Sequence, residues 1–118
     1  MSDAFTLSAA GFEGPLEALL DLIEARKFSI SQVSLADVCD AYLAYLEKMP
    51  ELPLKETAQF ILIASTMLLI KSRSLLPGME LSQDERESVE ELERRLSYLR
   101  AVRNAAKILK GEWGRAPL

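Results

Sequence analysis

The sequence contains no histidine and only one cysteine, Cys39. Histidine is the usual general base near neutral pH and the commonest metal ligand, so its absence argues against most hydrolase and metalloenzyme chemistry. A single cysteine cannot form an internal disulfide or complete a zinc site. We therefore expect a protein that is not an enzyme, holds no metal or cofactor, and resides in the reducing cytoplasm.

The chain also lacks an excess of basic charge, a secretory leader and a long apolar run. Its 14 Lys and Arg against 18 Asp and Glu give a net charge of -4, which argues against direct, non-specific DNA binding. Residues 1–5 lack the basic start and apolar stretch of a signal peptide. The apolar run Phe60–Ile70 is too short to span a bilayer and closes on Lys71 and Arg73. We expect no membrane contact.

Five glycines and five prolines divide the 118 residues into four predicted helices. Hydrophobic residues make up 49% of the chain, enough for a core, and no segment alternates as a strand would. The helices are predicted to begin at Gly14-Pro15, after an N-cap at Ser34 supported by Asp37, at Leu54, and after the capping box Ser82–Glu85; the third ends near Leu76 and the fourth at Gly111. The predicted fold class is all-α, a small domain of about four helices.

The predicted helices suggest three parts of the chain. Residues 1–80 form an N-terminal helical domain, residues 81–110 a long helix, and residues 111–118 a flexible tail. Trp113 in that tail is either a contact for a partner or an unused chain end.

The third helix has two apolar stripes on opposite sides. The first stripe is Leu54, Ala58, Ile61, Leu62, Ser65, Leu68, Leu69 and Leu76; the second is Phe60, Ile63, Met67 and Ile70. In so short a chain, one helix rarely has core on both sides, so one stripe suggests a partner. The alternative is that neighbouring helices cover both stripes, and the pattern alone leaves the two interpretations open.

The fourth helix is long and polar, with acidic residues in its first half and basic residues in its second. This order complements the helix macrodipole. It also favours a helix that projects from the domain, although packing on the other three helices stays open. A projecting helix could pair with the same helix of a second copy.

Only one short segment suggests catalysis. Lys71 lies beside Ser72 and Ser74, which would allow a serine nucleophile with a lysine base, as in a small hydrolase. Nothing else in the sequence completes such a site, so a polar helix end is the better interpretation. Cys39 falls on a predicted core stripe and is expected to be a small buried hydrophobe.

Ordered motifs along the chain resemble a known bacterial family. Residues 12–23, Phe-Glu-Gly-Pro-Leu followed by a leucine-rich helix, are similar to the opening of segregation and condensation protein A (ScpA), the bacterial kleisin family. Residues 33–46, with two Tyr-Leu pairs, resemble that family's next helix. Residues 64–77 resemble its most recognisable motif, a leucine helix that closes on Lys-Ser-Arg-Ser-Leu-Leu-Pro, and residues 91–99 resemble the helix that follows.

The resemblance implies a non-catalytic subunit of a chromosome condensation and partition complex. The N-terminal domain of such a kleisin packs on the coiled-coil neck of an SMC (structural maintenance of chromosomes) ATPase, and a later segment binds a ScpB dimer. The assembled ring entraps DNA, so DNA contact is indirect and the expected location is the cytoplasm, with the nucleoid. A full-length member continues past Leu118, so we expect an N-terminal piece or a naturally short form.

Together with the resemblance, the two stripes receive different roles. The first stripe is expected to hold the domain together, and the second to meet the neck as an added strand of a helical bundle. The residues predicted to contact the SMC neck are Leu43, Tyr45, Phe60, Ile63, Met67, Ile70 and Lys71. Leu96 and Leu99 are predicted to face ScpB. The alternative function is a self-associating helical module without an SMC partner.

Overall fold

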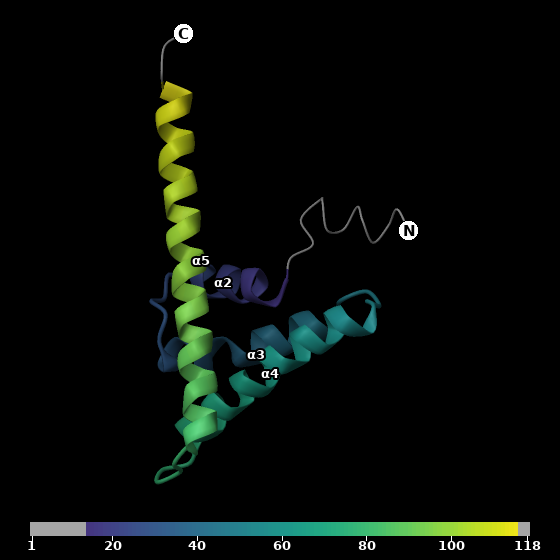
Figure 1. Ribbon diagram of the computed structural model, residues 1–118. Helices are drawn as coiled ribbons and strands as arrows, with labels where there is room; N and C mark the ends of the chain where they lie inside the picture. The colour runs from purple at the N-terminus through teal and green to yellow at the C-terminus, as the bar shows by residue number, and fades with distance from the viewer. Residues whose placement is uncertain (1–13, 116–118) are drawn as a thin grey trace.

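Four α-helices account for most of residues 14–115, the part of the chain that the computed structural model describes; side chains are described as far as residue 111. They are α2 (Pro15–Ala25), α3 (Gln32–Glu47), α4 (Leu54–Leu75) and α5 (Gln83–Arg115) (Figure 1). No strand occurs between residues 14 and 115, which confirms the all-α prediction and its long fourth helix. Phe12, Glu13 and residues 116–118 lie outside the described residues, as does the Trp113 side chain.

The helix starts follow local sequence signals. Pro15 occupies the first turn of α2, where its missing N–H costs no hydrogen bond. The capping box of α5 forms as predicted: the Ser82 N–H donates to Glu85 Oε1 at 2.8 Å, and the Glu85 N–H donates to Ser82 Oγ at 3.1 Å. After α4, Gly78 has φ +84°, a left-handed conformation that glycine adopts without strain.

The predicted N-cap of α3 is wrong. Ser31, not Ser34, caps the helix, and Ser34 closes a reciprocal box: its N–H donates to Ser31 Oγ at 3.2 Å, and the Ser31 N–H donates to Ser34 Oγ at 3.0 Å. A serine thus takes the place that usually belongs to Glu or Gln in such a box. Ser34 was predicted as the N-cap because the acidic Asp37 lies three residues later. That arrangement is a weaker N-cap signal than the pair Ser31 and Ser34.

The predicted end of α5 at Gly111 is also wrong, because the helix continues to Arg115. The predicted tail is therefore helical over 111–115. Glycine ends a helix by taking a left-handed backbone conformation, and Gly111 does not take it. Inside a helix, glycine costs only about 1 kcal/mol relative to alanine, which is too little to stop a long helix.

The core lies where α2, α3, α4 and the first half of α5 meet. Its largest contributors are Leu19, Leu20 and Ile23 from α2; Leu35, Val38, Cys39 and Tyr42 from α3; Phe60, Ile63, Met67 and Ile70 from α4; and Val89, Leu92 and Leu96 from α5. Burial raises the pKa of the Cys39 thiol, and Cys39 is a core residue, as predicted.

The burial of the two stripes of α4 is the reverse of that predicted. The second stripe, Phe60, Ile63, Met67 and Ile70, is buried, with Met67 at 0% exposed. The first stripe is largely open to solvent: Leu54 is 84% exposed and Leu62 66%. The physical reason is that α2 and α3 lie on the side of the second stripe, whereas α5 crosses near the end of α4 and leaves the other side uncovered (Figure 1).

One buried hydrogen bond ties α3 to α4. The Tyr42 hydroxyl donates to the backbone carbonyl oxygen of Phe60 at 3.0 Å, and Tyr42 is 0% exposed. Burial, with the neighbouring Tyr45, raises the pKa of Tyr42 well above its usual range, so the hydroxyl keeps its proton. The Tyr45 ring stacks on Phe60 with 6.5 Å between ring centroids. The pairing of these two helices is therefore specified by both polar and aromatic contacts.

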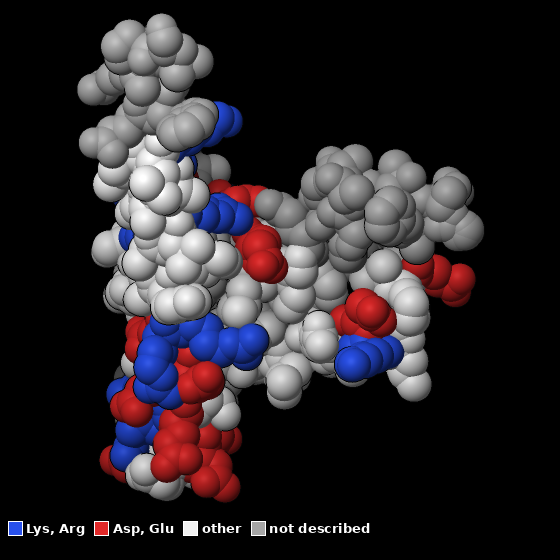
Figure 2. Space-filling model, turned by 45° about the horizontal axis from the view of Figure 1, so that its top comes forward, with Lys and Arg blue, Asp and Glu red and all other residues white. Residues whose placement is uncertain are grey.

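The first half of helix α5 packs on the domain and its end projects from it. Each of the two alternatives that the sequence left open, packing and projection, is therefore true of one part of the helix. Val89, Leu92 and Leu96 are buried against α2 and α4. Residues 104–111, which we call the arm, are all exposed and extend beyond α2 (Figure 1). Charged residues of both signs gather over the first half of α5, whereas the arm is mostly uncharged on the face seen in Figure 2.

A charge placed on either stripe of α4 distinguishes core from surface. We expect Met67→Asp to unfold the domain or destabilise it by about 4 kcal/mol or more, because it buries an unpaired carboxylate. The matched control is Leu68→Asp, whose position is 45% exposed and whose cost we expect to stay below about 1 kcal/mol. Urea unfolding followed by circular dichroism measures both, and equal costs for the two variants would contradict the burial pattern.

The Tyr42 hydroxyl can be tested by its removal. We expect Tyr42→Phe to lower the free energy of unfolding by about 1–2 kcal/mol, because the buried bond to the Phe60 carbonyl is lost while the ring remains. Tyr98→Phe removes a hydroxyl from a side chain that is 73% exposed and should leave stability unchanged. Thermal and urea unfolding of the two variants provide the measurement. An unchanged free energy of unfolding in Tyr42→Phe would show that the hydrogen bond makes no net contribution to stability.

Candidate partner-binding surface

The exposed side of α4 is the most prominent apolar surface of the described chain. Its residues, which we call the outer stripe, are Leu54, Ala58, Ile61, Leu62, Ser65, Leu68, Leu75 and Leu76. No charged residue occurs between Thr57 and Ile70, so the outward side of the helix carries no charge over more than three turns. Large exposed apolar surfaces of this kind usually mark contact sites for other molecules.

The polar residues along this side of α4 add little polarity to it. The Ser65 hydroxyl donates to the carbonyl oxygen of Ile61 at 3.1 Å, and the Thr66 hydroxyl donates to that of Leu62 at 3.4 Å. Both hydroxyls are therefore satisfied by the helix's own backbone, one turn earlier. A partner that covers the outer stripe would not have to provide hydrogen bonds for them.

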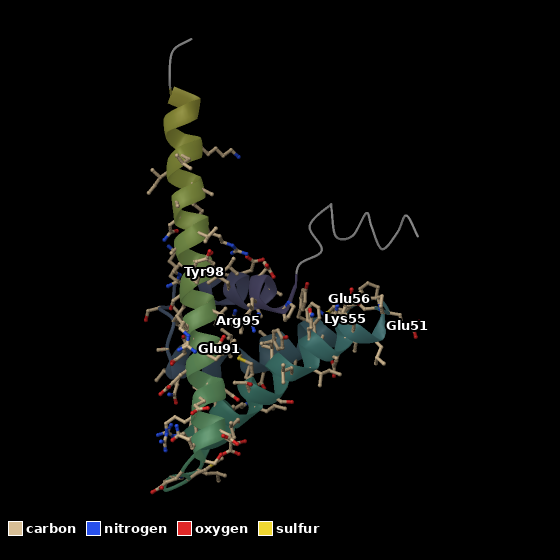
Figure 3. The ribbon with its side chains drawn as sticks, in the orientation of Figure 1. Glu51, Lys55, Glu56, Glu91, Arg95 and Tyr98 are labelled. Atoms are coloured by element: carbon tan, nitrogen blue, oxygen red, sulfur yellow. The ribbon has the colours of Figure 1, made fainter. Side chains whose placement is uncertain are left out.

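A hollow of about 190 Å³ opens beside the outer stripe, at the end where α3 connects to α4. Its lining is mostly apolar and consists of Leu46, Met49, Pro50, Leu52, Thr57, Phe60 and Ile61. We call it the hairpin hollow. Glu51, Lys55 and Glu56 surround the same end of α4 (Figure 3). Because Ile61 belongs to both features, a side chain from a partner on the outer stripe could also enter the hollow.

A second hollow, of about 370 Å³, lies between the start of α2, the middle of α4 and α5. Leu62 of the outer stripe borders it, and so do Glu17, Gln59 and Arg95. Arg95 lies on α5 between Glu91 and Tyr98, one turn from each (Figure 3). The outer stripe is therefore continuous with a more polar recess on its α5 side.

The residues predicted to contact a neck fall into two groups in the structure, core residues and half-buried residues. Phe60, Ile63, Met67 and Ile70 are core side chains, so the exposure on which their assignment rested is absent. Leu43, Tyr45 and Lys71 are half-buried at the α3–α4 contact. The outer stripe is visible in the sequence as a pattern but not as a surface, because a repeat of apolar residues does not say which repeat is covered.

The two residues predicted to face ScpB also lie in the domain. Leu96 is fully buried, and Leu99 is half-buried against the core. The exposed apolar side chains of α5 are Tyr98, Val102, Ile108 and Leu109, which the prediction did not include. Tyr98, Val102 and Leu109 follow one another at steps of four and seven residues along one side of α5 and into the arm, and Ile108 lies to the side of this row.

Lys71 does not form a catalytic pair with a serine. Its Nζ lies 2.6 Å from Asp40 Oδ1, and this hydrogen bond raises the pKa of Lys71, so the amine stays protonated and cannot accept a proton from a serine. The Ser74 hydroxyl donates instead to the backbone carbonyl of Lys71 at 2.8 Å. Within residues 14–111, no group of three or more Asp, Glu, Cys or His side chains is placed to hold a metal ion.

Helix α4 is also long and apolar enough, by length and composition alone, to cross a membrane. This is a weak indication, because a helix that supplies one side of a protein core meets the same two measures, and α4 supplies four large side chains to this core. The absence of membrane contact therefore stays a prediction.

Comparison with known proteins places the chain in a family. The family model described as "Segregation and condensation protein ScpA" matches residues 22–112. Segregation and condensation protein A of Clostridium tetani is 36% identical over 104 residues, which cover 85% of this chain and 41% of that protein. The Bacillus pumilus protein of the same name is 38% identical over 106 residues, covering 84% of this chain and 42% of the relative.

The relatives are longer than this chain. Segregation and condensation protein A of Bacillus cytotoxicus is 32% identical over 123 aligned residues that cover 97% of this chain but 49% of the relative. The chain therefore spans less than half the length of these relatives. No solved structure matches it. Since the family model covers most of the chain and the relatives exceed 30% identity over nearly all of it, the chain belongs to the segregation and condensation protein A family.

Proposed function

We propose that this domain is the N-terminal module of a bacterial kleisin and that it binds the coiled-coil neck of an SMC ATPase through the outer stripe of α4. Two observations support the proposal: the family to which the chain belongs, and the uncovered apolar side of a 22-residue helix. Such a helix is about 33 Å long, enough to lie along several turns of a partner helix. The exposed stripe is the single observation that carries the choice of surface.

The physical match is between two apolar seams. A coiled coil presents apolar side chains every three to four residues, and the outer stripe presents Ala58, Ile61, Ser65 and Leu68 at steps of three, four and three residues. Docking would convert the neck from two strands to a small helical bundle. The hairpin hollow beside Ile61 would receive one larger side chain of the neck and so fix the position of the domain along the coil.

We further propose a non-catalytic role in chromosome condensation and segregation, in the cytoplasm and with the nucleoid. In this role the domain links an SMC head to other subunits and meets DNA only through the assembled complex. Its net charge of -4 is consistent with that indirect contact. For the link to a ScpB dimer, the exposed side chains Tyr98, Val102 and Leu109 on α5 are better placed than the buried Leu96.

The second candidate function is self-association. The outer stripe would pair as readily with the same stripe of a second copy, and no feature of its apolar chemistry excludes that. Light scattering or sedimentation across a range of concentrations separates the two candidates. A neck-binding domain is expected to remain monomeric at concentrations at which it binds SMC.

Neck binding is tested by charges placed on the outer stripe. We expect Leu62→Asp and Leu68→Asp each to weaken binding to purified SMC head-plus-neck by about 10-fold or more, because each places a carboxylate in an apolar contact. Val33→Asp is the matched control: Val33 is exposed on α3 rather than on α4, and the variant should bind normally. Calorimetric titration measures the affinities.

The fold is monitored in the same samples by circular dichroism and thermal unfolding. Unchanged affinity of both stripe variants, with native unfolding temperatures, would contradict this surface. Equal loss of affinity in Val33→Asp would show that added negative charge, rather than the stripe, controls binding.

A further inference from the structure

Arg103 of α5 makes the longest-range polar contacts of the described chain. Its Nη1 donates to Asp21 Oδ1 at 2.7 Å and to Glu24 Oε1 at 3.2 Å, and its Nη2 donates to the backbone carbonyl of Glu17 at 3.4 Å. All three acceptors lie on α2, more than 75 residues earlier in the sequence. The guanidinium group therefore joins two side chains and the backbone of α2 at once.

Arg100, one turn earlier on α5, adds a second connection. Its Nη2 donates to the carbonyl oxygen of Phe28 at 3.0 Å, just beyond the end of α2, and its Nε lies 3.5 Å from Glu24 Oε2. Glu24 is thus shared by both arginines. The side chains of Arg100, Arg103 and Glu24 are only 23–30% exposed, so solvent screens these contacts less than those of an open surface pair.

These contacts lie where the apolar packing of α5 ends. Leu96 is buried and Leu99 half-buried, whereas every residue of the arm, 104–111, is exposed. In Figure 1, α2 crosses α5 near its middle, and the arm continues beyond it without support. The two arginines are therefore the last residues that hold α5 before it leaves the domain.

We propose that Arg100 and Arg103 form a latch that sets the direction of the arm relative to the rest of the domain. Apolar contacts such as that of Leu99 are non-directional, whereas a guanidinium group that donates to several fixed acceptors defines an orientation. The latch would thereby fix the geometry between two separate apolar surfaces, the outer stripe of α4 and the exposed side of the arm. The inference does not rest on neck binding, since it concerns contacts within the chain.

A consequence is that the arm can be released without unfolding the core. The latch is built from partly exposed ion pairs, which salt or a competing charged group weakens, while the core beneath it is apolar. With the latch open, α5 keeps its contacts through Val89, Leu92 and Leu96 and the arm gains freedom to tilt or fray. The arm would then depend on helix propagation from the packed part of α5, with no tertiary contact to prevent fraying from its end.

Distance measurements between spin labels test the latch. The labels are placed at Ala44→Cys on α3 and Lys110→Cys on the arm, both exposed positions. Cys39 can stay, because it is buried and its raised pKa keeps the thiol unreactive. In the otherwise unchanged chain we expect one narrow distance distribution, and with Arg100→Gln plus Arg103→Gln a distribution about twofold broader or more.

The matched control is Arg94→Gln plus Arg95→Gln. It removes the same charge from α5 about two turns earlier, where, among the residues that the structure describes, Arg94 pairs only with Glu91 of its own helix and neither arginine forms an ion pair with α2. We expect its distribution to match that of the unchanged chain. A control as broad as the latch variant would overturn the proposal, because it would assign the effect to the charge of α5 rather than to contacts with α2.

A second variant approaches the latch from the other helix. Asp21→Asn plus Glu24→Gln keeps the shape of both acceptors and removes their charge, and it should broaden the distribution as well. This variant also decides the matter if the arginine variant does not fold. Narrow distributions in the folded variants, or a distribution in the unchanged chain that is already as broad, would overturn the latch.

Discussion

The structure depends on one side of α4. Phe60, Ile63, Met67 and Ile70 pack against α3 and α2, and the Tyr42 hydroxyl on the Phe60 carbonyl fixes how α3 and α4 face one another. Once this side is buried, the helix cannot rotate, and the apolar residues on its opposite side are left in solvent. The core contact and the proposed partner surface are therefore two consequences of the same packing.

Helix α5 combines the two kinds of interaction differently. Apolar side chains hold its first half in place. Ion pairs of its own Arg100 and Arg103 with acidic residues of α2 hold its middle. Beyond them the helix has no neighbour among the described residues. The domain thus presents two exposed apolar surfaces, one on a rigid core helix and one on an arm whose direction depends on polar contacts. The role proposed above, a link between other proteins, would use such separate surfaces.

Local signals predicted the helices well because they act within a few residues. Pro15 and the Ser82–Glu85 box start their helices as expected, because Pro15 has no N–H that needs a partner and the box supplies acceptors for two N–H groups, whatever the tertiary context. The same kind of reasoning failed at Ser34 and Gly111. Near Ser34, the capping box of Ser31 and Ser34 starts the helix three residues earlier than predicted. At Gly111 the helix continues, because one glycine inside a long helix is only mildly unfavourable.

The sequence by itself determined the all-α class, most helix boundaries, the two stripes of α4 and the likeness to the family, because propensity, capping and motif order are properties of consecutive residues. Only the tertiary structure decided which stripe is buried and where α5 leaves the domain. Helical periodicity is symmetric: it shows that two sides of α4 are apolar but not on which side α2 and α3 lie. The contacts of Arg103 with Asp21 and Glu24 likewise join residues about 80 positions apart, and no local pattern records them.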